Sequence, residues 1–184
     1  MNIAFLMCGL LMLDGDQQML PETRAIVEFE RAADDYAFMH RRIERRQPPV
    51  ELTADVATLR QAIASMAEAM RIARPNAREG DLFAAPIRSV LRARIVKAMR
   101  LHDVTVDALE AEVTESVPVQ LTVNGDMPWR QTGSMPPCVL EVLPPLPPEL
   151  QYRFVGTDLV LVDVHASLIV DVLRDAALPM DTFR

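Results

Sequence analysis

Residues suited to chemistry gather near the C-terminus, in the stretch LVLVDVHASLIVD at positions 159–171. Asp163 and His165 lie two positions apart, so on a β-strand both side chains leave the same face. A carboxylate and a neutral imidazole are donors that divalent metal ions accept, although a complete site needs a third and a fourth ligand. A hydrolase in which this pair acts on a water is a further interpretation, but it lacks an identifiable nucleophile. We expect the simplest interpretation, in which both residues line the solvent face beside a turn.

Asp171 is the third ionisable residue of this stretch. A two-residue turn at Ala166–Ser167 would pair position 163 with 170 and position 162 with 171. That register places the side chain of Asp171 on the opposite face of the sheet from Asp163. Only a loop with an odd number of residues would bring the two carboxylates together, so we do not expect them to share a site.

The histidines are His40, His102 and His165, and they are far apart in the sequence. His40 lies at the centre of an apolar helical stripe, where a buried histidine serves either as a ligand or pH switch or as a core residue bonded to a carbonyl or a tyrosine hydroxyl. We expect the core role. His102 ends a predicted helix, where a cation complements the helix dipole. Three isolated histidines do not make a zinc signature.

Other chemical signals are weak. The chain contains no G-x-S-x-G, P-loop, G-x-G-x-x-G or H-E-x-x-H motif. Cys8 and Cys138 have no C-x-x-C or adjacent histidine context, so we expect small hydrophobic residues rather than nucleophiles. The run RRIERR at positions 41–46 is interpreted as arginines that interact with the helix dipole and with acidic neighbours such as Glu44; an anionic membrane or partner is the alternative. Arg94 falls within an apolar stripe, which indicates snorkelling or a buried ion pair.

The composition limits the class of protein. Half of the 184 residues are hydrophobic and 24% are charged, as in a globular protein with a substantial core. A formal net charge of −7 disfavours nucleic acid as a partner, because its phosphates reward a basic surface. Aromatic residues make up only 5% of the chain, which leaves few platforms on which bases could stack.

The first 20 residues contain an apolar segment, IAFLMCGLLML at positions 3–13. It is too short to span a bilayer as a helix but has the length of the apolar region of a secretory signal. No lysine or arginine precedes it and no clear small-x-small cleavage site follows, which a start codon placed too far downstream would partly explain. We expect export to the periplasm or the medium; a cytoplasmic protein is the alternative. An uncleaved segment would pack on the domain or a partner, or associate peripherally with a membrane.

The region 21–116 is predicted to be helical. Apolar residues recur at steps of 3 and 4 in two segments, from Pro21 to Arg46 and from a Thr53 cap to Ala73, and prolines end both. Their short proline-containing connection predicts an antiparallel helical hairpin. A third helix is expected over 81–101 with Asp81 as its cap, and a short fourth helix from 103 or 105 to about 113.

The region 117–184 is built differently. Alternation predicts a strand over 117–123, ending at the turn signal Asn124–Gly125, and a brief helix is expected over 136–143. The proline run 144–148 reads as a stiff polyproline segment. After it, three β-branched runs predict an antiparallel meander. The sequence therefore predicts an α+β protein: a helical hairpin with one or two further helices, then a small antiparallel sheet. We expect the sheet and the helices to form one compact unit.

The C-terminal segment PPLPPELQYRFVGTDLVLVDVHASLIVDVL resembles the terminal β-module of small bacterial periplasmic proteins. These include the nickel/cobalt-homeostasis periplasmic family and several other envelope families. The matching pieces are Leu146–Pro148, Tyr152–Gly156, Val160–Asp163 and Ile169–Val172. The resemblance covers about 30 residues. It implies export and a β-hairpin tail and carries over no catalytic residue.

These patterns predict a non-catalytic exported or envelope protein that works through contacts with a protein partner or with further copies of itself, without a cofactor. Apolar helix stripes with coiled-coil spacing favour such contacts. The alternative is a periplasmic protein that responds to a divalent metal ion, with Asp163 and His165 as ligands. A hydrolase is the third choice.

Overall fold

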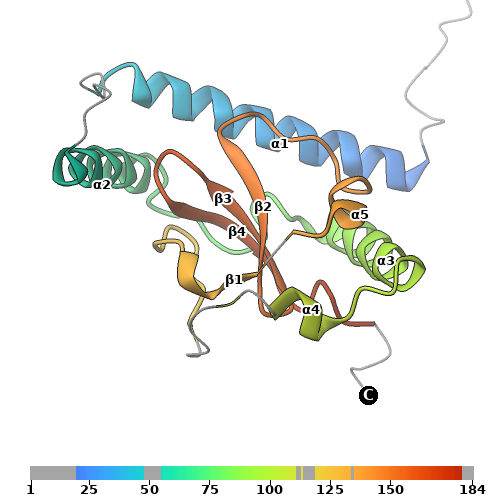
Figure 1. Ribbon diagram of the computed structural model, residues 1–184. Helices are drawn as coiled ribbons and strands as arrows, with labels where there is room; N and C mark the ends of the chain where they lie inside the picture. Colours follow the sequence, from blue (N-terminus) through green and yellow to red (C-terminus); the bar gives the residue numbers. More distant parts are fainter. Residues whose placement is uncertain (1–19, 48–54, 111–112, 114–118, 134, 180–184) are drawn as a thin grey trace, which may run out of the picture.

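The computed structural model describes residues 20–47, 55–110, 113, 119–133 and 135–179 (Figure 1). Residues 1–19, to which the expected export segment and Cys8 belong, lie outside the described residues. No helix within the described ranges combines the length and the apolar character needed to cross a membrane.

The α+β class and the order of helices before sheet are confirmed. The helices are α1 (Pro21–Glu44), α2 (Val56–Ala73), α3 (Ala85–Leu101), α4 (Val106–Glu110) and α5 (Pro137–Leu140), with a 3-10 turn, η1, at Trp129–Gln131. The strands are β1 (Thr132–Gly133), β2 (Leu150–Val155), β3 (Asp158–Asp163) and β4 (Leu168–Leu173). The expected meander is β2–β3–β4, and β1 extends it to an antiparallel sheet in the order β1-β2-β3-β4.

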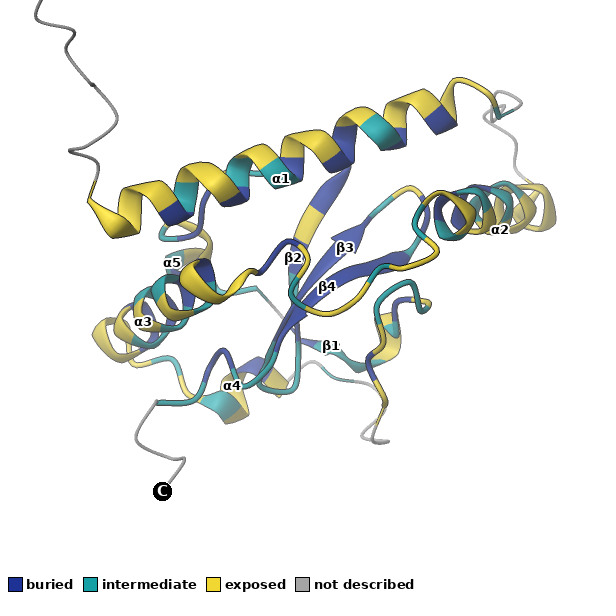
Figure 2. Ribbon diagram, turned by 180° about the vertical axis from the view of Figure 1, so that it is seen from behind, coloured by how far each residue is buried: buried dark blue, intermediate teal, exposed yellow. Residues whose placement is uncertain are grey.

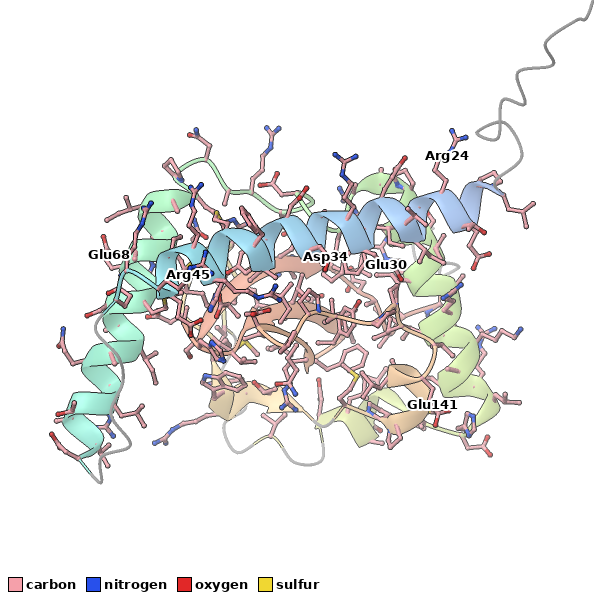
Figure 3. The ribbon with its side chains drawn as sticks, turned by 90° about the horizontal axis from the view of Figure 1, so that it is seen from above. Arg24, Glu30, Asp34, Arg45, Glu68 and Glu141 are labelled. Atoms are coloured by element: carbon pink, nitrogen blue, oxygen red, sulfur yellow. The ribbon has the colours of Figure 1, made fainter. Side chains whose placement is uncertain are left out.

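Helix α1 lies across one face of the sheet, with α2 near one of its ends and α3 near the other (Figures 1 and 3). It therefore crosses α2 rather than forming the expected antiparallel hairpin. The reason lies in where the apolar stripe of α1 finds its partners. Phe29 stacks on Phe83 and on Tyr152 of β2, with ring centroids 5.7 and 6.4 Å apart. The stripe is thus buried against the sheet and the loop before α3 (Figure 2).

The helix starts differ in detail from the expected ones. Asp55 caps α2, because its carboxylate accepts hydrogen bonds from the amides of Ala57 and Thr58. Thr53, the expected cap, lies outside the described residues. Helix α3 begins at Ala85, so Asp81 lies in the preceding loop rather than at the cap. Arg94 forms an ion pair with Glu22 at 2.8 Å, but both side chains are partly exposed, so the pair is not the buried one that was expected.

The strand predicted over 117–123 is wrong for its described part: residues 119–123 form no strand. Instead, the segment that follows runs along the outer edge of β4. Asn124 and Ile169 are joined by a 2.8 Å hydrogen bond, Gly125 accepts from Ile169 at 2.9 Å, and Met127 donates to Ser167 at 2.8 Å. The expected turn at Asn124–Gly125 therefore exists, but it belongs to an irregular segment that hydrogen-bonds to β4 and does not begin a hairpin.

Strands β3 and β4 are buried on both faces of the sheet. One face packs against the helices in the main core, with Leu159, Leu161 and Leu168 among its residues. The other carries a smaller cluster beneath the segment that holds Leu121 and Met127. Every residue of β4 is buried as a result. Two charged residues of these strands, Asp163 and Asp171, are fully buried with them and need internal partners.

Asp171 obtains its partners from the loop before α3. Its carboxylate accepts hydrogen bonds from the backbone amides of Gly80, Leu82 and Phe83 at 2.7–2.8 Å. The expected register was wrong here. Asp163 of β3 pairs with Leu168 of β4 across a four-residue turn. The register shifts between Leu161 and Val162, so Leu161 pairs with Asp171. Asp171 consequently lies on the same face as Asp163, not the opposite one, but serves a different loop.

We expect Asp171→Ala to lower the free energy of unfolding by about 3 kcal/mol, because several loop amides would lose their acceptor while remaining buried. Urea denaturation followed by circular dichroism measures the change. Asp35→Ala removes an exposed carboxylate from α1 and should be nearly neutral. Equal effects of the two substitutions would contradict the anchoring role of Asp171.

Candidate metal centre

Asp163, the last residue of β3, is fully buried and accepts four hydrogen bonds. One carboxylate oxygen accepts from the Tyr36 hydroxyl at 2.7 Å and from Nδ1 of His40 at 2.6 Å. The other accepts from the backbone amides of His165 and Ala166 at 3.0 and 2.8 Å. The expectation that Asp163 lies on the solvent face is therefore wrong. Helix α1 covers this end of β3, and the turn folds its own amides onto the carboxylate.

His40 is buried in α1 as expected, but its partner is a carboxylate rather than a carbonyl or a tyrosine hydroxyl. An ionised carboxylate only accepts hydrogen bonds, so Nδ1 of His40 carries the proton. In the neutral imidazole this leaves the lone pair on Nε2, on the opposite side of the ring from Asp163. Burial lowers the pKa of His40, but the hydrogen bond and negative charge of Asp163 outweigh it and the pKa is raised.

Nε2 of His40 faces two further groups that could act as metal ligands, the imidazole of His165 and the carboxylate of Glu44. It lies 3.3 Å from Nδ1 of His165 and 3.9 Å from a carboxylate oxygen of Glu44. The other oxygen of Glu44 is 3.1 Å from the same nitrogen of His165. Ligands about 2.0–2.1 Å from a tetrahedral zinc ion are about 3.3 Å apart. Two of the separations, 3.3 and 3.1 Å, lie close to this tetrahedral edge, and one ligand atom from each of the three residues lies within 4.8 Å of the others.

Two elements bring these donors together. His40 and Glu44 are four residues apart on α1, so they share one face of the helix, and His165 comes from the β3–β4 turn. The His40 side chain is fully buried, whereas those of Glu44 and His165 are each 48% exposed. The cluster therefore has one fixed member inside the protein and two at its surface.

The turn that carries His165 is held from both sides. On the helix side, Asp163 binds its amides. On the other side, Ser167 accepts a hydrogen bond from the Met127 amide at its carbonyl and one from the Trp129 indole at its hydroxyl, at 2.8 and 2.6 Å. Ser167 has a φ of 53°, in the left-handed region, which these contacts help to maintain. The backbone of the turn is thus positioned before any ligand arrives.

Tyr36 donates the second hydrogen bond to the Asp163 oxygen that also accepts from His40. Burial and the nearby negative charge raise the pKa of Tyr36, so its hydroxyl stays protonated and donates. The guanidinium of Arg74 lies over the Tyr36 ring, 5.1 Å from its centroid, and donates to the carbonyl of Val170. This places a cation over the tyrosine ring and links the end of α2 to the same network.

Arg41 forms a neighbouring ion pair. Its guanidinium donates two hydrogen bonds to Glu149, at 2.6 and 3.0 Å, and the carbonyl of Glu149 accepts from the amide of Val164 at 3.0 Å. Of the run at 41–46, Arg41 thus pairs with a distant carboxylate, and Glu44 is left to face the histidines. The pair holds α1 to the start of β2, and the Glu149 carbonyl joins this point to the turn that follows β3.

The structure redistributes the residues singled out from the sequence. His165 and His40 meet, whereas Asp163 supports them from behind and is not a donor to the cluster. Asp171 lies with another loop, and His102 ends α3. Glu44 was interpreted only as an ion-pairing residue. Its spacing of four from His40 on a helix was the signal that pointed to a shared face.

Comparison of this chain with protein-family models, with curated proteins and with solved structures finds no match. The functional argument therefore depends on the geometry of the cluster.

The Arg41–Glu149 pair predicts a pH dependence of stability. The hydrogen bond from Arg41 lowers the pKa of Glu149, while burial opposes this effect. A carboxyl group whose pKa is lowered by folding stabilises the protein above its unfolded pKa, about 4.3, and this contribution is lost as the pH falls through the folded pKa. We expect Glu149→Gln to be less stable than the wild type at neutral pH, with the difference shrinking in acid.

Urea denaturation in a series of buffers from neutral to acidic pH measures this difference. Glu141→Gln, at an exposed position, is the matched control and should follow the wild-type curve. A difference between Glu149→Gln and the wild type that stays constant with pH would rule out the charge as its cause.

Proposed function

We propose that this protein binds a divalent transition-metal ion through Nε2 of His40, the carboxylate of Glu44 and Nδ1 of His165. The observation that carries the proposal is the convergence of three ligand atoms, all within 4.8 Å of one another, around a histidine whose other nitrogen is held by a buried carboxylate. The metal-responsive alternative considered for the sequence is thus preferred, but with a different ligand set.

The donor set favours particular ions. Two imidazoles and one carboxylate suit zinc, cobalt and nickel, whereas magnesium and calcium prefer oxygen ligands alone. The separation of 3.3 Å between the two imidazole nitrogens is close to the edge of a tetrahedron around zinc or cobalt. We therefore place Zn²⁺ and Co²⁺ ahead of Ni²⁺, and all three ahead of Mg²⁺.

Asp163 has the position of a supporting residue. Histidines that bind metals commonly donate their second ring N–H to a carboxylate, which fixes the tautomer and the ring orientation. The 2.6 Å contact from His40 to Asp163 is of this kind, and the Tyr36 hydroxyl holds the same oxygen. A hydrolase that uses Asp163 on a water is less well supported, since both of its oxygens are buried and already hydrogen-bonded.

The first test is metal binding by the tag-free full-length protein. Isothermal titration with Zn²⁺ and Co²⁺ should give one ion per chain. His165→Ala should weaken binding by more than about a hundredfold, because loss of a ligand exceeds the 10–100-fold cost of losing a supporting residue. His165 is half-exposed, so this variant should fold normally, as circular dichroism can verify.

His102→Ala is the matched control, because it removes the remaining histidine, at the end of α3, and should bind as the wild type does. The single tryptophan offers a second readout, since Trp129 is bonded to the turn that carries His165. Addition of Co²⁺ should quench its fluorescence. Equal binding by His165→Ala and the wild type, or no binding by either, would refute the proposal.

A second prediction concerns Asp163→Asn. The amide presents one acceptor fewer and no charge, so His40 is oriented less firmly and its Nε2 is a poorer donor. We expect metal affinity to fall about 10–100-fold, with the stoichiometry unchanged. Tyr36→Phe removes one hydrogen bond from Asp163 but leaves its charge, and should have a smaller effect. Competition with a coloured zinc chelator measures both affinities, and an unchanged affinity in Asp163→Asn would exclude its supporting role.

A further inference from the structure

The three donors leave one side of the cluster open. The His40 side chain closes the inner side, while those of Glu44 and His165 are each 48% exposed. Within the described parts of the chain, no fourth histidine, cysteine, aspartate or glutamate joins these three. The nearby carboxylates are committed elsewhere, because Asp163 accepts four hydrogen bonds and Glu149 holds Arg41.

The number of protein ligands separates two kinds of zinc site. Structural sites are closed by four protein ligands, whereas sites that exchange ligands have three and keep a water in the fourth position. A divalent ion on one carboxylate and two neutral imidazoles carries a net charge of +1 with its ligands. Asp163 lies behind the His40 ring, on the far side from Nε2, so its charge does not face the open position.

Resting on the proposed function, we infer that the bound ion keeps an exchangeable fourth position, which takes a water or a small monodentate anion from solvent. The positive charge of the ion and its ligands favours an anion, and the two half-exposed ligands leave it a path of approach. The centre is thus an open site that presents a Lewis-acidic ion at the surface, in contrast to a closed site that only holds the fold together.

The test uses the full-length protein loaded with Co²⁺, whose visible absorption reports the geometry and identity of its ligands, with azide as the probe anion. Azide should shift the Co²⁺ bands in a saturable way, with one azide per ion, and acetate should compete with it. His102→Ala, which keeps the triad, should give the same azide titration as the wild type.

The outcomes separate the inference from the proposed function. No Co²⁺ spectrum at all would mean that the metal site itself is wrong. A one-to-one Co²⁺ complex whose spectrum azide leaves unchanged would overturn the open position and leave metal binding intact. The same would follow if light scattering showed that Co²⁺ doubles the mass and azide does not bind, because a second copy would then supply the fourth ligand.

Discussion

The arrangement around the sheet depends on the burial of one charge, the carboxylate of Asp163. An ionised carboxylate removed from water is costly unless hydrogen bonds replace its hydration. Here a hydroxyl and an imidazole from α1 and two amides from the β3–β4 turn do so. Each of these groups is thereby placed: Tyr36 and His40 orient α1 over the end of β3, and the turn amides curl His165 toward the helix. The donor cluster is a consequence of satisfying this carboxylate.

The second buried carboxylate shows the same physics with a different outcome. Asp171 binds the amides of the loop before α3 and so positions Phe83, which stacks on Phe29 of α1. Within the described part of the chain, its hydrogen-bond partners are backbone amides, and no imidazole is among them. Two aspartates on one face of the sheet therefore have different roles. Asp171 binds a loop to the core, and Asp163 positions polar residues that reach the surface.

Burial of both faces of β3 and β4 explains why these charges have specific partners. The helices cover one face, and the segment with Leu121 and Met127 covers the other over β3 and β4, so these two strands present no solvent face to which an aspartate could turn. In a sheet with one wet face, Asp163 would have been solvated, as the sequence pattern suggested. The segment that closes the second face also holds the turn through Ser167, so one piece of irregular chain both seals the sheet and steadies the site.

The sequence by itself determined the α+β class, the approximate extents of the helices and the β2–β3–β4 meander, because periodicity, prolines and β-branched runs act over a few residues. It also marked His40, Asp163 and His165 as unusual. Only the tertiary structure decided that α1 crosses the sheet and that a four-residue turn and a register irregularity put both aspartates on one face. It also decided that His40 and Glu44 meet His165, which is more than 120 positions away from both. These features depend on which surfaces cover one another and on how buried charges find hydrogen bonds, and such long-range choices leave no local pattern in the chain.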